Sequence, residues 1–367
     1  MSVKLRGLFA LCFVFMIVTK TSAQIYDKMK GGGTPDPQLS QEDNDFLSRQ
    51  AGVFLDTIQS ILTNYPPSIH EKKERGTAKL LMDAVFHEHF AVYRKPVQVF
   101  FQARIDQLIK ELEETKVDKG VVIWKVYNMG FIARTKTVTL AFDLVTGITS
   151  GSKEFAIGTD KLSRIVRQCD ALLITHRHPD HADKTVAEKF IELGLPVLAP
   201  DEVWKGDSIH GKLNLPERSA DKVQPLKLKK YTLDMVVYPG HQLRSIENNV
   251  YLVKTPEGIT LAHIGDQINE GDFMVDFGWI DQVAKNHHVD VLMPNAWTTD
   301  IFRIVKGFNP ELVMPGHELE LGHTVWDRLP YWGDDEFLGL NYSLLKKSEF
   351  PVVVTFWGES YHYYPKK

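Results

Sequence analysis

The stretch Thr175-His176-Arg177-His178-Pro179-Asp180-His181 directly follows the apolar run 170–174. Six consecutive residues of this stretch contain four side chains that can bind a metal: His176, His178, Asp180 and His181. Neutral imidazole and carboxylate are ligands that zinc and other borderline cations accept. Successive side chains of a strand point to opposite faces, so all four can converge only from a loop, which Pro179 and Asp180 favour. The stretch therefore predicts a metal-binding loop just past a strand end, where α/β folds usually carry their active sites.

Three later stretches repeat the pattern of an apolar run, a turn residue and a metal-binding side chain. The runs 235–240, 259–265 and 312–316 end at His241, Asp266 and His317. A six-residue cluster cannot fill two metal shells alone, so we expect these three side chains to contribute. His323 competes for the last position. We favour His317 because it directly ends a strand with a Pro-Gly turn.

This order of residues resembles the metallo-β-lactamase superfamily, whose signature is His-x-His-x-Asp-His, then a histidine, an aspartate after glycine and a last histidine. The resemblance covers about residues 120–367 and implies an α/β fold, the αββα metallo-β-lactamase sandwich, with the site at one edge. It implies two divalent metal ions. We favour Zn²⁺, and Mn²⁺ and Fe²⁺ also suit His and Asp ligands. The implied first-metal ligands are His176, His178 and His241, the second-metal ligands are Asp180, His181 and His317, and Asp266 bridges both.

Two divalent ions a few Å apart lower the pKa of a shared water, which becomes a hydroxide near neutral pH. The resemblance therefore implies a hydrolase in which a metal-bridging hydroxide attacks a carbonyl or phosphoryl centre. Asp180 is the expected catalytic residue, since it would both bind metal and orient the nucleophile. Thr175, Asp183 and His263 are candidates to hold the imidazoles in place.

The residues around Asp266 narrow the branch of the superfamily. Classical β-lactamases of this fold place a cysteine near this position or lack a bridging carboxylate. Cys169 cannot serve as that cysteine, because it precedes the metal-binding loop. An antibiotic-destroying enzyme is therefore not expected. Thioester hydrolases usually follow Gly-Asp with Thr, whereas Gln267 stands here.

The stretch 291–298, with Met-Pro at its centre, resembles the lactonase and phospholipase-like branch, in which such a strand lines the pocket. The side chains that we expect in the substrate pocket are Asn295, Trp297 and Thr298.

Two functions fit these features. The first is hydrolysis of a small ester, lactone or phosphodiester. The second is a non-catalytic metal-binding or partner-binding protein that retains the fold. The complete ligand set favours hydrolysis, because degenerate members commonly lose ligands. The formal net charge of −4, with no long basic run, gives no reason to expect nucleic acid as a partner.

The first 23 residues have the pattern of a signal peptide. Lys4 and Arg6 precede the apolar run 8–18, and small residues at 21–23 suit cleavage before Gln24. We therefore expect an exported protein, periplasmic or extracellular. The alternative is an N-terminal membrane anchor, although a bilayer span needs roughly 20 apolar residues. Cleavage would leave no stable membrane span, would remove three positive charges to give −7, and would leave Cys169 as the only cysteine.

Residues 24–117 are expected to form a linker and an N-terminal helical region. Ser40 with Asp43 suits a helix start, Phe46, Phe54, Ile58, Ile61 and Leu62 recur at helical spacing, and Pro66-Pro67 ends the helix. Further helices are predicted over 72–87 and from about Val97. The pattern turns β-rich near Gly120, so residues 118–367 are predicted to form the hydrolase domain. The helices could mediate a homo-oligomer or cover the cleft, and the sequence leaves both open.

Overall fold

A computed structural model describes residues 36–86, 88, 90–147, 152–242, 245–267, 276–296, 298, 301–317 and 350–366. The predicted signal peptide, Trp297 and His323 lie outside the described residues. Within the described part, no helix is long and apolar enough to cross a membrane.

The first described helix begins where the sequence predicts it. The side-chain oxygen of Ser40 accepts the backbone N–H of Asp43 at 3.1 Å and caps α2 (Gln41–Asn64). The helix ends just before the two prolines, which cannot continue it. The expected inward position of Phe46 is wrong, since this side chain is 56% exposed. It lies about 140° around the helix from buried Ala51, at about 100° per residue.

Two more helices complete the N-terminal region, α3 (Lys73–Phe86) and α4 (Lys95–Glu114), with the short 3-10 helix η1 (Ala91–Tyr93) between them. The helix expected from about Val97 corresponds to α4, and the apolar residues that recur along one of its faces are buried: Phe101, Ile105, Leu108, Ile109 and Leu112.

The first of two six-stranded sheets has mixed pairing. Its strands, in spatial order, are β12 (Ser360–Tyr363), β1 (Val121–Lys125), β2 (Phe131–Arg134), β3 (Thr139–Phe142), β4 (Ala171–Leu173) and β5 (Val197–Leu198). The pairs from β12 to β3 are antiparallel, and β3, β4 and β5 run parallel. The metal-binding loop leaves the carboxyl end of β4, inside this parallel half.

The second sheet also mixes both pairings. Its order is β11 (Leu312–Val313), β10 (Val291–Met293), β9 (Thr260–His263), β8 (Ile246–Lys254), β7 (Thr232–Gln242) and β6 (Ser219–Lys227). Strands β9, β10 and β11 are parallel, so the segments after them emerge at one edge.

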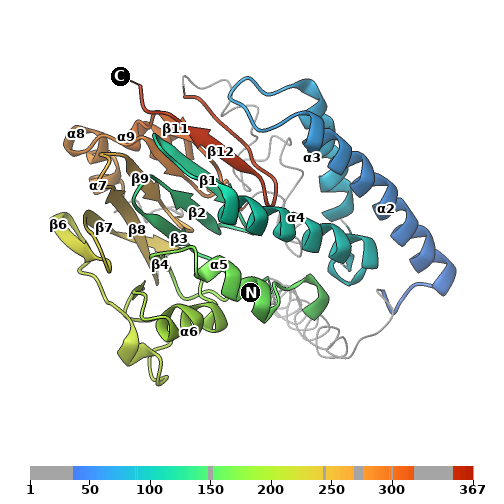
Figure 1. The fold of residues 1–367 in the computed structure, drawn as a ribbon, viewed down its shortest axis with the longest axis horizontal. Helices are drawn as coiled ribbons and strands as arrows, with labels where there is room; N and C mark the ends of the chain where they lie inside the picture. The colour runs from blue at the N-terminus through green and yellow to red at the C-terminus, as the bar shows by residue number, and fades with distance from the viewer. Residues whose placement is uncertain are drawn as a thin grey trace, which may run out of the picture.

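One apolar layer lies between the two sheets, and helices cover both outer faces (Figure 1). The helices α5 (Thr159–Val166) and α6 (Lys184–Glu192) join α2 to α4 on the first sheet. The second sheet is covered by α7 (Phe277–Ile280), α8 (Val283–Asn286) and α9 (Ile301–Phe308). The predicted αββα sandwich is therefore confirmed.

The N-terminal helices share their core with the first sheet. Phe101 of α4 stacks on Phe155 of η3 (Lys153–Phe155) at 4.1 Å between ring centroids and meets Trp357 edge-on at 5.4 Å. On α3, Arg75 donates to both carboxylate oxygens of Glu359, at 2.9 and 2.7 Å. The boundary near residue 117 stays a prediction, and one hydrophobic cluster continues across it.

Candidate metal centre

The metal-binding loop is held between a strand and a helix. It leaves β4 after Leu173 and ends at Asp183, whose carboxylate accepts the N–H groups of Thr185 and Val186 and caps α6. Within the loop, the backbone N–H of His181 donates to the carbonyl of His178 at 3.0 Å. This turn brings side chains to one side that a continuing strand would separate. The loop predicted from the sequence is present.

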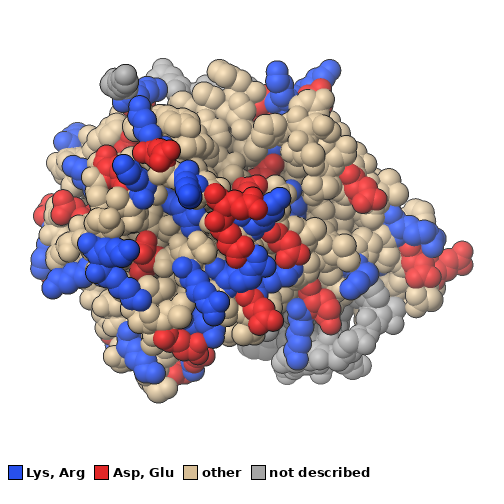
Figure 2. Space-filling view, in the orientation of Figure 1, with Lys and Arg blue, Asp and Glu red and all other residues tan. Residues whose placement is uncertain are grey.

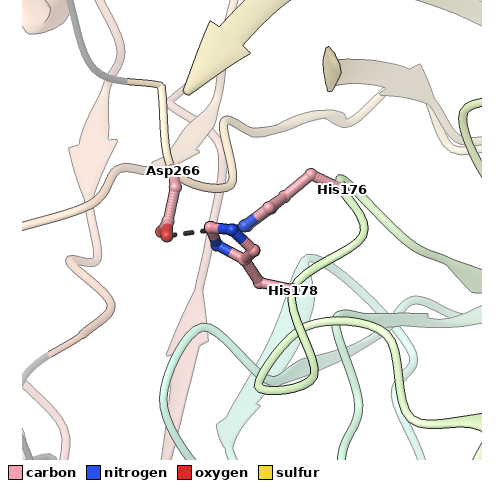
Figure 3. A group of neighbouring side chains, drawn as sticks. All are labelled: His176, His178 and Asp266. Atoms are coloured by element: carbon pink, nitrogen blue, oxygen red, sulfur yellow. Dashed lines mark ion pairs between the residues drawn. The ribbon is translucent and has the colours of Figure 1, made fainter. Parts of the chain in front are cut away.

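A first group of potential ligands joins the two sheets. His176 and His178 come from the loop after β4, and Asp266 comes from the segment after β9 (Figure 3). Their ligand atoms all lie within 4.8 Å of one another, and His176 Nε2 is 3.6 Å from Asp266 Oδ2. His176 is fully buried, whereas His178 is half-buried.

A second group consists of Asp180, His181 and His317. His181 Nε2 lies 3.3 Å from Asp180 Oδ2 and 3.1 Å from His317 Nε2. The carboxylate of Asp266 also reaches this group, with Oδ1 at 2.7 Å from His317 Nε2 and Oδ2 at 3.3 Å from His181 Nε2. Asp266, a member of the first group, therefore also contacts the second group.

The donor set fits divalent cations. Buried His176 Nε2 has no hydrogen-bond partner among the described atoms, although a buried polar nitrogen is costly to leave unpaired. Imidazole nitrogens and carboxylate oxygens converge here, which is the chemistry that zinc, manganese and iron accept.

Burial and neighbouring charges set the protonation of the protein groups. Burial, followed by the charge of His181, lowers the pKa of His176 to about 3, so its imidazole is neutral and able to bind a metal. Burial likewise lowers the pKa of His178. Burial alone would raise the pKa of Asp266, but His181 and His317 outweigh it and hold that pKa well below its ordinary value.

Asp143 is a part of the site that the sequence reading missed. It lies directly after β3, is fully buried, and its Oδ2 is 2.8 Å from His181 Nδ1. It also accepts the backbone N–H and the hydroxyl of Thr175, at 2.7 and 2.6 Å. The available signal was an apolar run, 138–142, that ends in a carboxylate. This is part of the pattern that pointed to the three later ligands, but no turn residue separates the run from Asp143.

The three residues proposed to hold imidazoles have different contacts. Thr175 fits, because its Oγ1 is 3.1 Å from His176 Nδ1. Asp183 instead caps α6 and accepts the N–H and hydroxyl of Thr146. His263 belongs to neither ligand group; its Nε2 lies 2.9 Å from the carbonyl of Met129.

His241 is one of the last two residues of strand β7, so the strand does not end at the Pro239-Gly240 pair before it. Strand β7 runs through Pro239 and Gly240 to Gln242, and His241 pairs with Glu247 of β8. The long pairing with β8 keeps this stretch extended despite its turn-forming residues. His241 is in neither ligand group, and its Nδ1 lies 3.1 Å from both carboxylate oxygens of Asp276. Its role as a metal ligand stays a prediction.

Two amides hold the carboxylate of Asp266. The Asn295 amide donates to Oδ1 at 3.0 Å, and the Gln242 amide donates to Oδ2 at 2.8 Å. Asn295, expected in the substrate pocket, thus contacts a potential metal ligand. Thr298 is fully buried, and its hydroxyl has no hydrogen-bond partner among the described atoms. The assignment of Asn295, Trp297 and Thr298 to a substrate pocket stays a prediction.

Cys169 is expected to be chemically inert in the folded protein. It is buried, and burial raises the pKa of its thiol to about 12, so very little thiolate forms near neutral pH. In a Cys12→Ser variant, a thiol-specific colour reagent should react with less than one thiol per chain in buffer and with one thiol in denaturant. Rapid reaction in buffer would contradict this expectation.

The fold and the paired groups define a class: αββα proteins with a His/Asp metal centre at the sheet edge. A model of the Beta-lactamase superfamily domain matches residues 131–317, which is half of the chain. The chain belongs to the metallo-β-lactamase superfamily.

The curated relatives cover part of this chain. A protein of Salmonella gallinarum named probable L-ascorbate-6-phosphate lactonase UlaG is 26% identical over 195 residues, which are 44% of this chain and 51% of the relative. Its counterpart in Escherichia fergusonii is 27% identical over 192 residues, with the same two coverages. The chain thus spans about half the length of the curated relatives it matches.

Solved structures of similar fold are distant in sequence. A metallo hydrolase from Ignicoccus hospitalis is 17% identical with a TM-score of 0.46, over 68% of this chain and 100% of that chain. The diiron β-hydroxylase CmlA from Streptomyces venezuelae is also 17% identical with a TM-score of 0.46, over 67% of this chain and 55% of that chain.

Proposed function

We propose that this protein is a metal-dependent hydrolase that uses two divalent cations to cleave a small ester, lactone or phosphodiester. The position of Asp266 carries the proposal. Its Oδ1 contacts His317 of one group, and its Oδ2 faces His176 of the other at 3.6 Å. The same Oδ2 also lies 3.3 Å from His181, which belongs to the group of His317. A carboxylate that reaches both groups in this way suits two metals sharing a ligand and a water.

The side chains of the site would bind the metals and orient the attacking water. Two divalent cations bound in these groups would make water nucleophilic near neutral pH and stabilise negative charge on the attacked oxygen. His176 would stay a neutral ligand, because burial keeps its pKa at about 3. Asp180 lies beside His181 and is 19% exposed, so its carboxylate can reach a water molecule and orient the proton of that water. Burial opposes ionisation of Asp180, but His181 lowers its pKa below the ordinary range. Asp180 would therefore accept a hydrogen bond rather than keep a proton.

The named relatives and the surface charge favour a small-molecule substrate. The relatives carry the name of a lactonase, which supports lactones among the candidates. Lys and Arg side chains are interspersed with Asp and Glu on the face drawn in Figure 2, so that face offers no continuous basic track for nucleic acid. We also keep export to the periplasm or outside the cell, and Zn²⁺ as the metal, as proposals.

A substrate screen with a matched variant tests the proposal. The protein from residue 24 onward, reconstituted with zinc, manganese or iron, would be assayed against lactones, phosphodiesters and simple esters. We expect turnover of at least one class and a loss of about 100-fold or more in His178→Ala, since a metal contributes several kcal/mol to catalysis. His288→Ala is the control, because His288 is an exposed histidine outside both ligand groups.

The alternative function has its own signature in the same experiment. If the wild-type protein holds two metals while it and His178→Ala are equally inert on every class, the hydrolase proposal fails. A non-catalytic metal-binding or partner-binding protein that retains the fold would then be the better reading.

A further inference from the structure

A buried carboxylate, that of Asp276, contacts the Nδ1 side of the His241 ring. Asp276, which is only 5% exposed, directly precedes α7 and places both carboxylate oxygens 3.1 Å from His241 Nδ1. The His241 side chain is 28% exposed, so part of the ring is open to solvent. Histidines that bind metals through one nitrogen commonly donate the other N–H to such a carboxylate.

A single amide fixes both partners of this pair. Gln267 is fully buried, and its Oε1 accepts the backbone N–H of His241 at 3.0 Å. Its Nε2 donates to Asp276 Oδ2 at 2.7 Å. The indole N–H of Trp279 approaches Asp276 Oδ1 at 3.3 Å. The backbone and the ring of His241 are therefore both tied to the same buried group.

Glycine at position 240 makes room for this arrangement. A Cβ atom there would lie 2.1 Å from Gln267 Oε1 and 2.8 Å from the carbonyl oxygen of Asn248. Real Cβ contacts are never that short, so any other residue would push Gln267 away from His241. The Pro239-Gly240 pair thus admits a buried amide within a continuing strand.

We propose that Asp276 and Gln267 are positioning residues that fix the tautomer and the place of His241. The amide of Gln267 and the indole of Trp279 already donate to the two carboxylate oxygens of Asp276, so these oxygens act as acceptors. The His241 nitrogen that faces them is therefore assigned as the donor. Nδ1 is then protonated, and Nε2 keeps the lone pair that a metal needs. This inference rests on the proposed function, because it supposes that His241 serves a metal centre.

The arrangement also couples His241 to the bridging carboxylate. Gln267 directly follows Asp266, so the segment that carries Asp266 is anchored to β7 through the side chain of its next residue. This assigns a physical role to the residue that departs from the Gly-Asp-Thr pattern of the thioester hydrolases.

The decisive variant is Asp276→Asn, with zinc itself as the probe. Asparagine presents an N–H₂ group where Gln267 or Trp279 already donates, so the amide cannot satisfy all three donors. We expect one of the two zinc ions to bind about 10- to 100-fold more weakly in competition with a chelating dye, while the other is unchanged. Asp281→Asn is the control, since Asp281 lies on the same short segment in an exposed pair with Arg303.

Nitrogen NMR of labelled histidine gives a readout that a merely structural role would not move. In the wild type, His241 should show the Nδ1–H tautomer, and in Asp276→Asn this signal should shift or become a mixture. Asp276→Glu should keep the tautomer. Gln267→Leu, which leaves the carboxylate in place, should keep the tautomer and weaken zinc binding less than Asp276→Asn does.

A double variant decides whether Asp276 acts through His241. In a His241→Ala background, Asp276→Asn should cause no further loss of zinc affinity, because partners in one contact are not additive. The inference would be overturned if Asp276→Asn lowered zinc affinity equally in the wild-type and His241→Ala backgrounds. It would also be overturned if Asp276→Asn bound both zinc ions as tightly as the wild type and kept the His241 tautomer. Failure of the proposed function is distinguishable, since it would appear as absent turnover in a wild type that still binds two zinc ions.

Discussion

Replacing Asp266 with asparagine is expected to reduce hydrolysis by on the order of 10³-fold or more, because several kcal/mol of metal-dependent stabilisation would be lost. The carboxylate is 2.7 Å from His317 and 3.3 Å from His181, and it accepts amides from Gln242 and Asn295. An amide in its place carries no charge, and its N–H₂ end would face other donors. Both groups of potential ligands include or contact Asp266, so metal content should fall together with activity.

The measurement for Asp266→Asn is turnover alongside metal content per chain. Asp290→Asn is a matched control, because Asp290 is equally buried but accepts Thr260 N–H and the Tyr363 hydroxyl at the start of β10. The control should lose some stability and keep its metals. Full metal content and unimpaired turnover in Asp266→Asn would rule out a bridging role.

Replacing Asp143 with alanine is expected to destabilise the metal-free protein by roughly 3–5 kcal/mol, the usual cost of removing one partner from a buried charged network. Three donors would lose their acceptor: the N–H and hydroxyl of Thr175 and the Nδ1 of His181. The imidazole of His181 would then be free to rotate, so zinc should also bind about 10- to 100-fold more weakly. Denaturant unfolding and zinc titration measure the two effects.

The acid dependence of stability gives Asp143→Ala a further check. Burial alone would raise the pKa of Asp143, but His181 and Thr175 lower it overall. A carboxyl with a lowered folded pKa contributes stability above its unfolded pKa, about 4, and loses it as the pH falls through the folded pKa. The variant should therefore lose less stability than the wild type on acidification below about pH 4. Asp170→Ala is the control, since Asp170 accepts the N–H of Thr139 at the far end of the same strands.

The sequence predicts the fold well because strand-end chemistry and helical spacing are local signals. The cap at Ser40 and the loop after β4 follow from residues that are neighbours in the chain. The αββα sandwich is implied by the resemblance to the superfamily, and the structure has it. The same local pattern places Asp266 and His317 after strands, where the structure has them. Parallel strands then bring these distant segments to one edge.

What the sequence does not reveal depends on contacts between distant segments. Nothing near Pro239-Gly240 shows that pairing with β8 extends β7 through His241. Nothing near Asn295 in the sequence shows that its amide reaches Asp266. Asp143 lies 38 residues before His181 and directly follows a strand, so its place at a strand end was within reach of sequence reasoning, whereas its contact with His181 was not.

The shared core beneath the first sheet has a consequence for how this protein could change over time. Phe101 of α4 packs against Phe155 and Trp357, which come from the middle and the end of the chain. Protein interiors are close-packed, so a larger ring at one of these positions needs a smaller one at another. The helices before residue 117 therefore cannot drift independently of the half that bears the metal centre. A homologue with different N-terminal helices would therefore also need different aromatic residues at the positions of Phe155 and Trp357, against which α4 packs.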